Sequence, residues 1–167
     1  MPLTINSAIA AVFVFLMLYA AISDVSSLRI PNWISIAAIG LFGLFLLVGG
    51  KSLPLLHHGL AALTLLAVGF AAFSFGYVGG GDVKLATAVG LWAGPQQSLV
   101  FLFWMSLFGA GLALVVLVGK RWLYWDETGW SPSRLSQMFP AWIRKGSVPY
   151  GVAISAGAVI AVPSVIF

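Results

Sequence analysis

The 167-residue chain has no cysteine, which excludes disulfide bonds, cysteine-based zinc sites and thiol nucleophiles. Charge is also scarce, because charged residues make up 7% of the chain against about 25% in a typical soluble domain. Hydrophobic residues make up 61%, so we expect an integral membrane protein. The formal net charge of +4 does not indicate nucleic-acid binding, because the basic residues are thinly spread and flank apolar stretches.

Long uncharged runs predict the membrane spans, since a helix needs about 20 apolar residues to cross a bilayer. The uncharged stretch from Leu85 to Gly119 is too long for one span, and Gly94-Pro95-Gln96-Gln97 predicts a break within it. We therefore expect an all-α polytopic protein with about six transmembrane helices in a single domain, residues 1–167. The predicted helices cover about 4–22, 33–49, 55–75, 83–94, 98–118 and 149–166.

Positive charge is unevenly distributed over the loops of this topology. Lys51 falls alone on one side, whereas the other basic residues share the opposite side: Arg29, Lys84, Lys120, Arg121, Arg134, Arg144 and Lys145. The positive-inside rule places that richer side in the cytoplasm and both termini outside. Asp24 closes the first helix and Asp82 opens the short fourth helix, so both acids are expected at the cytoplasmic end, bordering one watery cavity.

Residues 119–147 form the one substantial polar segment, between the fifth and sixth helices, and are rich in tryptophan. Ser131 and Pro132 predict a helix start, and Leu135, Met138, Phe139 and Trp142 follow with helical spacing. We interpret the segment as a membrane-surface anchor, with a substrate gate as the alternative.

Asp24 and Asp82 are the most informative residues, because a carboxylate at membrane depth costs a few kcal/mol and usually serves a function. Gly79, Gly80 and Gly81 directly precede Asp82; such a run allows positive φ angles and lets another backbone approach closely. Lys84 follows two residues later, and we expect it to pair with a lipid phosphate or to tune Asp82.

Other polar residues have structural interpretations. Asn32 is expected to cap the second helix, and Arg29 to act as a topology charge or as a partner of a carboxylate or lipid phosphate. His57 and His58 are expected at the external membrane interface, far from the aspartates. Gly151 and the other small residues of the last helix are interpreted as helix packing.

Two carboxylates without a serine–histidine pairing or cysteine indicate aspartic-protease chemistry. One ionised carboxylate draws a proton from water while its protonated neighbour donates to the scissile carbonyl, since adjacent like charges cannot both ionise easily. This chemistry needs no cofactor. A metal site is disfavoured, because neither His nor Cys is close to the two acids in the sequence.

At these residues the chain resembles the prepilin peptidases of the type IV leader peptidase family. The resemblance rests on Asp24 with Arg29-Ile30-Pro31-Asn32, on Gly79-Gly80-Gly81-Asp82-Val83-Lys84, and on Pro149-Tyr150-Gly151. It implies catalytic Asp24 and Asp82, with Gly79, Gly80, Gly81 and Lys84 positioning substrate or loop. It also implies cleavage of a short basic leader from a prepilin or pseudopilin at the cytoplasmic face of the bacterial inner membrane.

The chain resembles the short members of the family, those of the tight-adherence (Flp) pilus systems, so a small Flp-type prepilin is the expected substrate and no methyl transfer is expected. Two other functions stay open. The acids could relay ions in a small transporter or channel, although no paired repeats are visible. The chain could also be a non-catalytic pilus-assembly protein. Its oligomeric state does not follow from the sequence.

Overall fold

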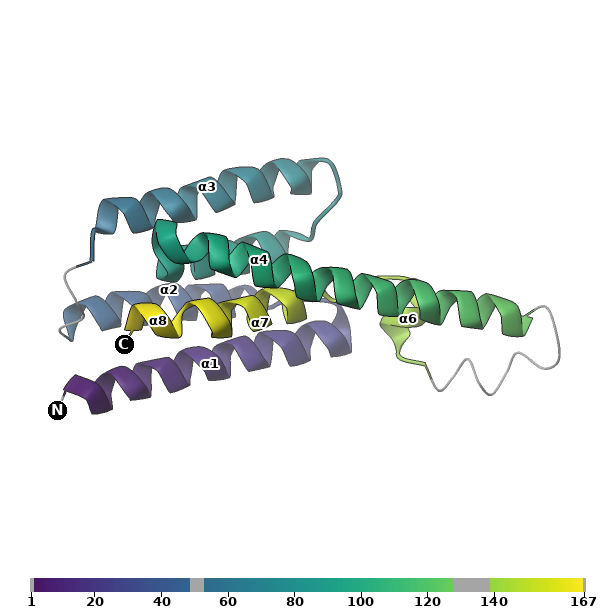
Figure 1. Cartoon of the computed structure of the whole chain (residues 1–167), viewed down its shortest axis with the longest axis horizontal. Coiled ribbons are helices and arrows are strands. Elements are labelled where there is room, and N and C mark those ends of the chain that lie inside the picture. Colours follow the sequence, from purple (N-terminus) through teal and green to yellow (C-terminus); the bar gives the residue numbers. More distant parts are fainter. Residues whose placement is uncertain (1, 49–52, 128–138, 167) are drawn as a thin grey trace.

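The computed structural model describes residues 2–48, 53–127 and 139–166 of the chain. These residues form helices and their connections, with no strand in the described ranges, which confirms the all-α prediction. The helices are α1 (Pro2–Ser27), α2 (Asn32–Leu47), α3 (Leu55–Ser74), α4 (Gly80–Glu127), α6 (Ala141–Lys145), α7 (Tyr150–Ala161) and α8 (Pro163–Ile166). Figure 1 shows them as a bundle with both chain termini at one end.

Three stretches of the described helices are long and apolar enough to cross a bilayer: Ile5–Ser27, Leu55–Ser74 and Gly80–Trp122. Two shorter stretches, Asn32–Leu47 and Tyr150–Ile166, are also apolar. The chain therefore has the helices of a membrane protein, and the count of six spans stays a prediction. The single domain also stays a prediction.

A sharp break divides α4 at the place where the sequence predicted one. Gly94 has φ 62° and ψ −174°, a conformation that is essentially restricted to glycine, and Pro95 follows it. The predicted break of four residues is wrong in extent, because residues 95–97 are already helical. We call residues 80–93 the first half of α4 and residues 95–127 its second half.

The first half of α4 runs alongside α2 in the same direction. Lys84 donates a hydrogen bond to Asn32 at the start of α2, and Trp92 donates one to the Ala38 carbonyl further along that helix. The two contacts are six residues apart on α2, from Asn32 to Ala38, and eight residues apart on α4, from Lys84 to Trp92, so the two helices run parallel. The starts of both helices therefore lie at the same end of the bundle.

The second half of α4 runs back antiparallel to α7. Phe101 packs closely on Gly157, and further along Gly109 lies next to Tyr150 at the start of α7. The helix then continues far beyond α7 and projects past the rest of the bundle, as Figure 1 shows. Residues 119–127 are thus helical, which corrects the prediction that the fifth helix ends at residue 118.

An aromatic cluster forms the centre of the bundle. Trp92 is fully buried, and its ring centroid lies 5.1 Å from that of Phe13, 5.3 Å from Phe42 and 5.6 Å from Phe45. The indole N–H is satisfied by the Ala38 carbonyl at 2.8 Å, as a buried tryptophan requires. This cluster ties α1, α2 and the first half of α4 together, and α7 and α8 complete the same core.

Other predicted boundaries need correction. The first helix ends at Ser27 instead of residue 22, and the last predicted helix is split into α7 and α8, because Pro163 has no N–H to continue the ladder. The helix predicted to start at Ser131 falls in residues 128–138, outside the described residues. Pro140 precedes the short helix α6.

Candidate active site

Asp24 lies on the buried stripe of α1. It follows Phe13, Met17 and Ala20, all buried, at spacings that put the four residues on one helix face. Only 5% of Asp24 is exposed. Its side chain therefore lies inside the bundle, although the residue is only three positions before the last residue of α1, Ser27. The prediction that this acid closes the helix is therefore wrong by about one turn, because α1 continues to Ser27.

The Asp24 carboxylate is held by the start of α7. Its Oδ2 accepts the backbone N–H of Gly151 at 2.6 Å, a contact between residues 127 positions apart. Gly151 is the second residue of α7, where the N–H groups of a helix have no partner inside the helix. The carboxylate satisfies one of these orphan donors, and the helix dipole favours a negative charge at this place.

Asp82 is the third residue of α4, and its carboxylate reaches back to the start of its own helix. Its Oδ2 accepts the Gly79 N–H at 3.3 Å, while the Val83 N–H donates to the Gly79 carbonyl at 3.2 Å. This is the acid half of a capping box, which fixes the side chain over the first turn. Asp82 is half-buried, so it is more accessible than Asp24.

The structure brings the two predicted acids together. The charge of Asp24 acts directly on Asp82, and among the described residues neither carboxylate is paired with a Lys or Arg side chain. Each acid is instead held by one backbone N–H at the start of a helix. Such a pair can divide the roles of proton acceptor and proton donor, because two adjacent carboxylates resist double ionisation.

The glycine run before Asp82 does not adopt the positive φ angles that it allows, and its role in positioning substrate or loop stays a prediction. The described glycines with positive φ angles are Gly76, Gly94 and Gly146, so Gly79, Gly80 and Gly81 do not use that freedom. The expectation of a close backbone approach does hold at Gly81. A Cβ atom there would lie 3.2 Å from the carbonyl oxygen of Ile30, in the connection between α1 and α2.

Lys84 and Asn32 form a pair next to the acids. The Lys84 Nζ donates to the Asn32 Oδ1 at 3.0 Å. The prediction that Asn32 is the N-cap of α2 is therefore wrong. Pro31 occupies that position, and no side chain caps the helix there. The hydrogen bond from Lys84 to Asn32 joins the starts of α2 and α4, and the pairing of Lys84 with a lipid phosphate stays a prediction.

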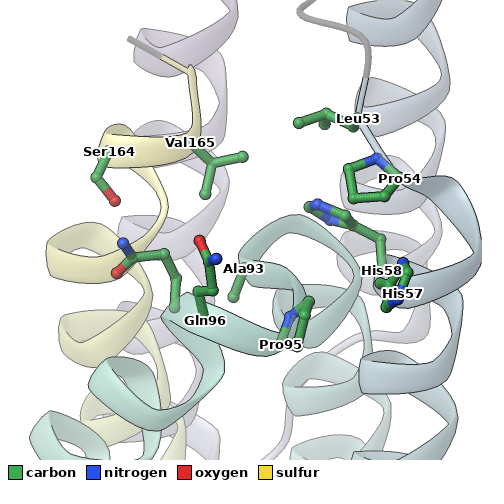
Figure 2. Close-up of a pocket in the computed structure, with 10 residues that line it drawn as sticks. Leu53, Pro54, His57, His58, Ala93, Pro95, Gln96, Ser164 and Val165 are labelled. Atoms are coloured by element: carbon green, nitrogen blue, oxygen red, sulfur yellow. The ribbon is translucent and has the colours of Figure 1, made fainter.

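Figure 2 shows His57 and His58, in the first turn of α3, at a pocket of about 470 Å³. Neither acid is among the residues that line it. Its lining also includes Pro95, Gln96 and Ser164, from α4 and α8. His57 is exposed, whereas His58 is 5% exposed and its Nδ1 lies 2.8 Å from the Leu91 carbonyl. His58 is therefore buried in the bundle, and its place at the external membrane interface stays a prediction.

Sequence reasoning missed two residues of the site. Ile30 is 9% exposed and contacts both helix starts that hold the acids, and Gly151, interpreted as helix packing, is the hydrogen-bond partner of Asp24. The Pro149-Tyr150-Gly151 motif could have singled out Gly151, because a motif glycine at a helix start often permits a close approach. No local signal indicates that Ile30 is buried.

Known proteins resemble this chain along most of its length. Residues 11–114, which include both acids, match the type IV leader peptidase family. The chain is 31% identical over 159 residues to the "Prepilin leader peptidase/N-methyltransferase" of Bacillus subtilis (strain 168), an alignment that covers 91% of this chain and 54% of that protein. The chain therefore spans about half the length of this curated relative. No solved structure gave a significant match.

Proposed function

The chain belongs to the type IV leader peptidase family, and we propose that it is a membrane-embedded aspartic endopeptidase that removes the short basic leader of prepilins. One observation supports this function above the others: Asp24 of α1 and Asp82 of α4 meet at one end of the bundle, and neither carboxylate is paired with a Lys or Arg side chain of the described residues. A paired acid and base is the minimum that peptide hydrolysis without a covalent intermediate requires.

In the proposed reaction the singly protonated pair does the chemistry. The ionised carboxylate takes a proton from a water molecule as that water attacks the scissile carbonyl carbon, and the protonated carboxylate donates to the carbonyl oxygen. One carboxyl group then protonates the leaving nitrogen, while the other takes back a hydroxyl proton from the tetrahedral intermediate as the carbonyl reforms and the C–N bond breaks, so the pair again shares one proton. Gly79, Gly80, Gly81 and Lys84 are proposed to border the bound peptide, because they surround Asp82 at the start of α4.

The depth of the acids fits a substrate that is itself a membrane helix. Gly109 of α4 lies next to Tyr150, which directly precedes Gly151, the hydrogen-bond partner of Asp24. From Gly109 onward, α4 has no charged residue before Lys120. The ten residues from Gly109 to Gly119 rise about 15 Å. We propose that the acids lie below the cytoplasmic surface of the bacterial inner membrane, where the junction of a prepilin leader and its apolar segment would be placed.

The substrate and the second activity of the relative are separate matters. We propose an Flp-type prepilin as the substrate, on the resemblance to the peptidases of the tight-adherence pilus systems. The name of the Bacillus subtilis protein includes an N-methyltransferase activity, and we do not extend this activity to the present chain.

The test is cleavage of a prepilin by the purified chain in proteoliposomes. Asp24→Asn and Asp82→Asn should each reduce cleavage by at least about 10²-fold, the lower range for a general acid or base, because an amide cannot take up or release the proton. His57→Ala, an exposed residue far from the acids, should cleave like the wild type.

Retained cleavage in either Asp→Asn variant would remove that residue from the mechanism. A wild-type chain that leaves all prepilins intact but carries ions in the same vesicles would favour the transporter. A chain that does neither would favour the assembly scaffold.

A further inference from the structure

The connection between α1 and α2 inserts one side chain between the two helix starts of the site. Leu28 adopts φ 54°, which is uncommon for a residue with a side chain, and the Ser23 hydroxyl donates to the Arg29 carbonyl at 2.9 Å. These features turn the chain sharply back on the end of α1. The following residue, Ile30, is thereby buried.

Ile30 contacts the start of each helix that holds an acid. On one side, a Cβ atom at Gly81 would lie 3.2 Å from the Ile30 carbonyl oxygen and 3.3 Å from the Ile30 Cβ. On the other side, a Cβ atom at Gly151 would lie 2.8 Å from the Ile30 Cδ1. Two glycines, one next to Asp82 and one bonded to Asp24, thus allow Ile30 to fit between the starts of α4 and α7.

Gly151 meets Asp24 as closely as it meets Ile30. A Cβ atom at Gly151 would lie 2.9 Å from both the Asp24 Cβ and the Asp24 Oδ2, a separation that real Cβ atoms essentially never show. Alanine at this position would keep the N–H donor but would push the carboxylate away from it. The absence of a side chain at residue 151 is therefore what lets the Asp24 carboxylate sit on the α7 N–H at 2.6 Å.

We propose that Gly151 and Ile30 are positioning residues that set the separation of the Asp24 and Asp82 carboxylates. Gly151 holds the Asp24 side chain by its N–H, and Ile30 acts as a spacer between the two helix starts. This inference rests on the proposed function for its kinetic consequence, because shared-proton chemistry needs a fixed distance between the two acids. The geometric consequence does not depend on that function.

The kinetic test compares Gly151→Ala with Gly157→Ala. Gly157 lies on the same helix, and a Cβ atom there would come within 2.9 Å of the Phe101 carbonyl oxygen, but the residue is remote from the acids. We expect Gly151→Ala to lower kcat about 10²-fold with KM nearly unchanged, the scale of a catalytic group displaced by about 1 Å. Gly157→Ala should lower the melting temperature and leave kcat per folded molecule unchanged.

A double variant separates positioning from simple crowding. Ile30→Val removes the Cδ1 that a new methyl group at residue 151 would meet, but it leaves the clash with Asp24 in place. Gly151→Ala with Ile30→Val should therefore recover melting temperature while kcat stays low. Recovery of kcat in this double variant would overturn the proposal, as would a wild-type kcat in Gly151→Ala alone. The double variant also carries the test if Gly151→Ala by itself does not fold.

Cross-linking measures the separation without any substrate. Because the chain has no cysteine, Asp24→Cys and Asp82→Cys together create one unique thiol pair, which bifunctional thiol reagents of graded length can bridge. Gly151→Ala in this background should slow bridging by the shortest effective reagent, because a methyl group at residue 151 still meets the Cβ of residue 24 at 2.9 Å, and Gly157→Ala should not. Equal bridging rates in the presence and absence of Gly151→Ala would overturn the inference, whether or not the wild-type chain cleaves prepilin.

Discussion

At the scale of single residues, the two acids occupy unequal places. Asp24 is buried on the core-facing stripe of α1 and depends on a residue from the far end of the chain, whereas Asp82 is half-buried and is held by its own helix. Their charges nevertheless interact. The behaviour of the pair in titration is therefore the property that distinguishes a proton-sharing dyad from two independent groups.

The first prediction concerns the pH dependence of cleavage. Activity needs one ionised and one protonated carboxylate, so cleavage should fall at low pH, where double protonation removes the base, and fall again at high pH, where loss of the second proton removes the acid. A bell-shaped profile of kcat/KM in proteoliposomes is expected. A rate that rises to a flat plateau through alkaline pH, in an enzyme that stays folded, would contradict the shared proton.

At the scale of one element, the break in α4 at Gly94 and Pro95 accounts for the burial of His58 next to it. Pro95 has no N–H, so the Leu91 carbonyl four residues earlier loses its helical partner. His58 of α3 replaces that partner with Nδ1 at 2.8 Å, and because a carbonyl only accepts, the ring must carry its proton on Nδ1. Gly94 leaves room for the ring, since a Cβ atom there would lie 2.7 Å from the His58 Cε1.

The second prediction follows from that hydrogen bond. His58→Ala should destabilise the fold by about 1–3 kcal/mol, the cost of a buried carbonyl without a partner. His57→Ala, the exposed neighbour, should change stability by less than about 0.5 kcal/mol. Thermal unfolding in detergent measures both, and cleavage per folded molecule should be unchanged in each. Equal stability of the two variants would show that the Leu91 carbonyl does not need the histidine.

The third prediction concerns the glycine of the same break. Gly94→Ala should cost about 1–3 kcal/mol from backbone strain alone, because its positive φ lies in a region reserved for glycine. Crowding of the His58 ring adds to this cost. Gly111→Ala in the second half of α4, where a Cβ atom would meet nothing within 4 Å, is the matched control and should be neutral or slightly stabilising in the same unfolding assay.

At the scale of the whole molecule, the proposed active site lies at one end of the bundle. The starts of α2, α4 and α7 and the last turns of α1 meet there, and the basic residues Arg29 and Lys84 lie beside them. The pocket with His57 and His58 lies at the other end, next to the break in α4. Orientation in the membrane therefore decides which compartment the acids face.

The fourth prediction concerns that orientation. The seven-to-one distribution of Lys and Arg predicts six spans with both termini outside and the acids facing the cytoplasm. Reporter fusions after Arg29, Lys84 and residue 130 should all report the cytoplasm. An external signal from the fusion after residue 130 would exclude six spans, because the second half of α4 would then end on the wrong side.

The sequence alone determined the properties that depend on local composition. Apolar runs of membrane length define the helices, the Gly94-Pro95 pair defines the break in α4, and charge scarcity makes Asp24 and Asp82 conspicuous. Helix ends were less accurate, because α1 continues past Asp24 to Ser27, and the hydroxyls of Ser26 and Ser27 bond to backbone carbonyls within the helix instead of ending it.

Only the tertiary structure decided how the acids are held. The partner of Asp24 is Gly151, 127 positions away, and that pairing depends on how α1 and α7 pack, which no local pattern encodes. The burial of Ile30 and the bond from His58 to Leu91 likewise arise where segments distant in sequence meet. Composition and periodicity describe each helix by itself, whereas the site is made of contacts between helices.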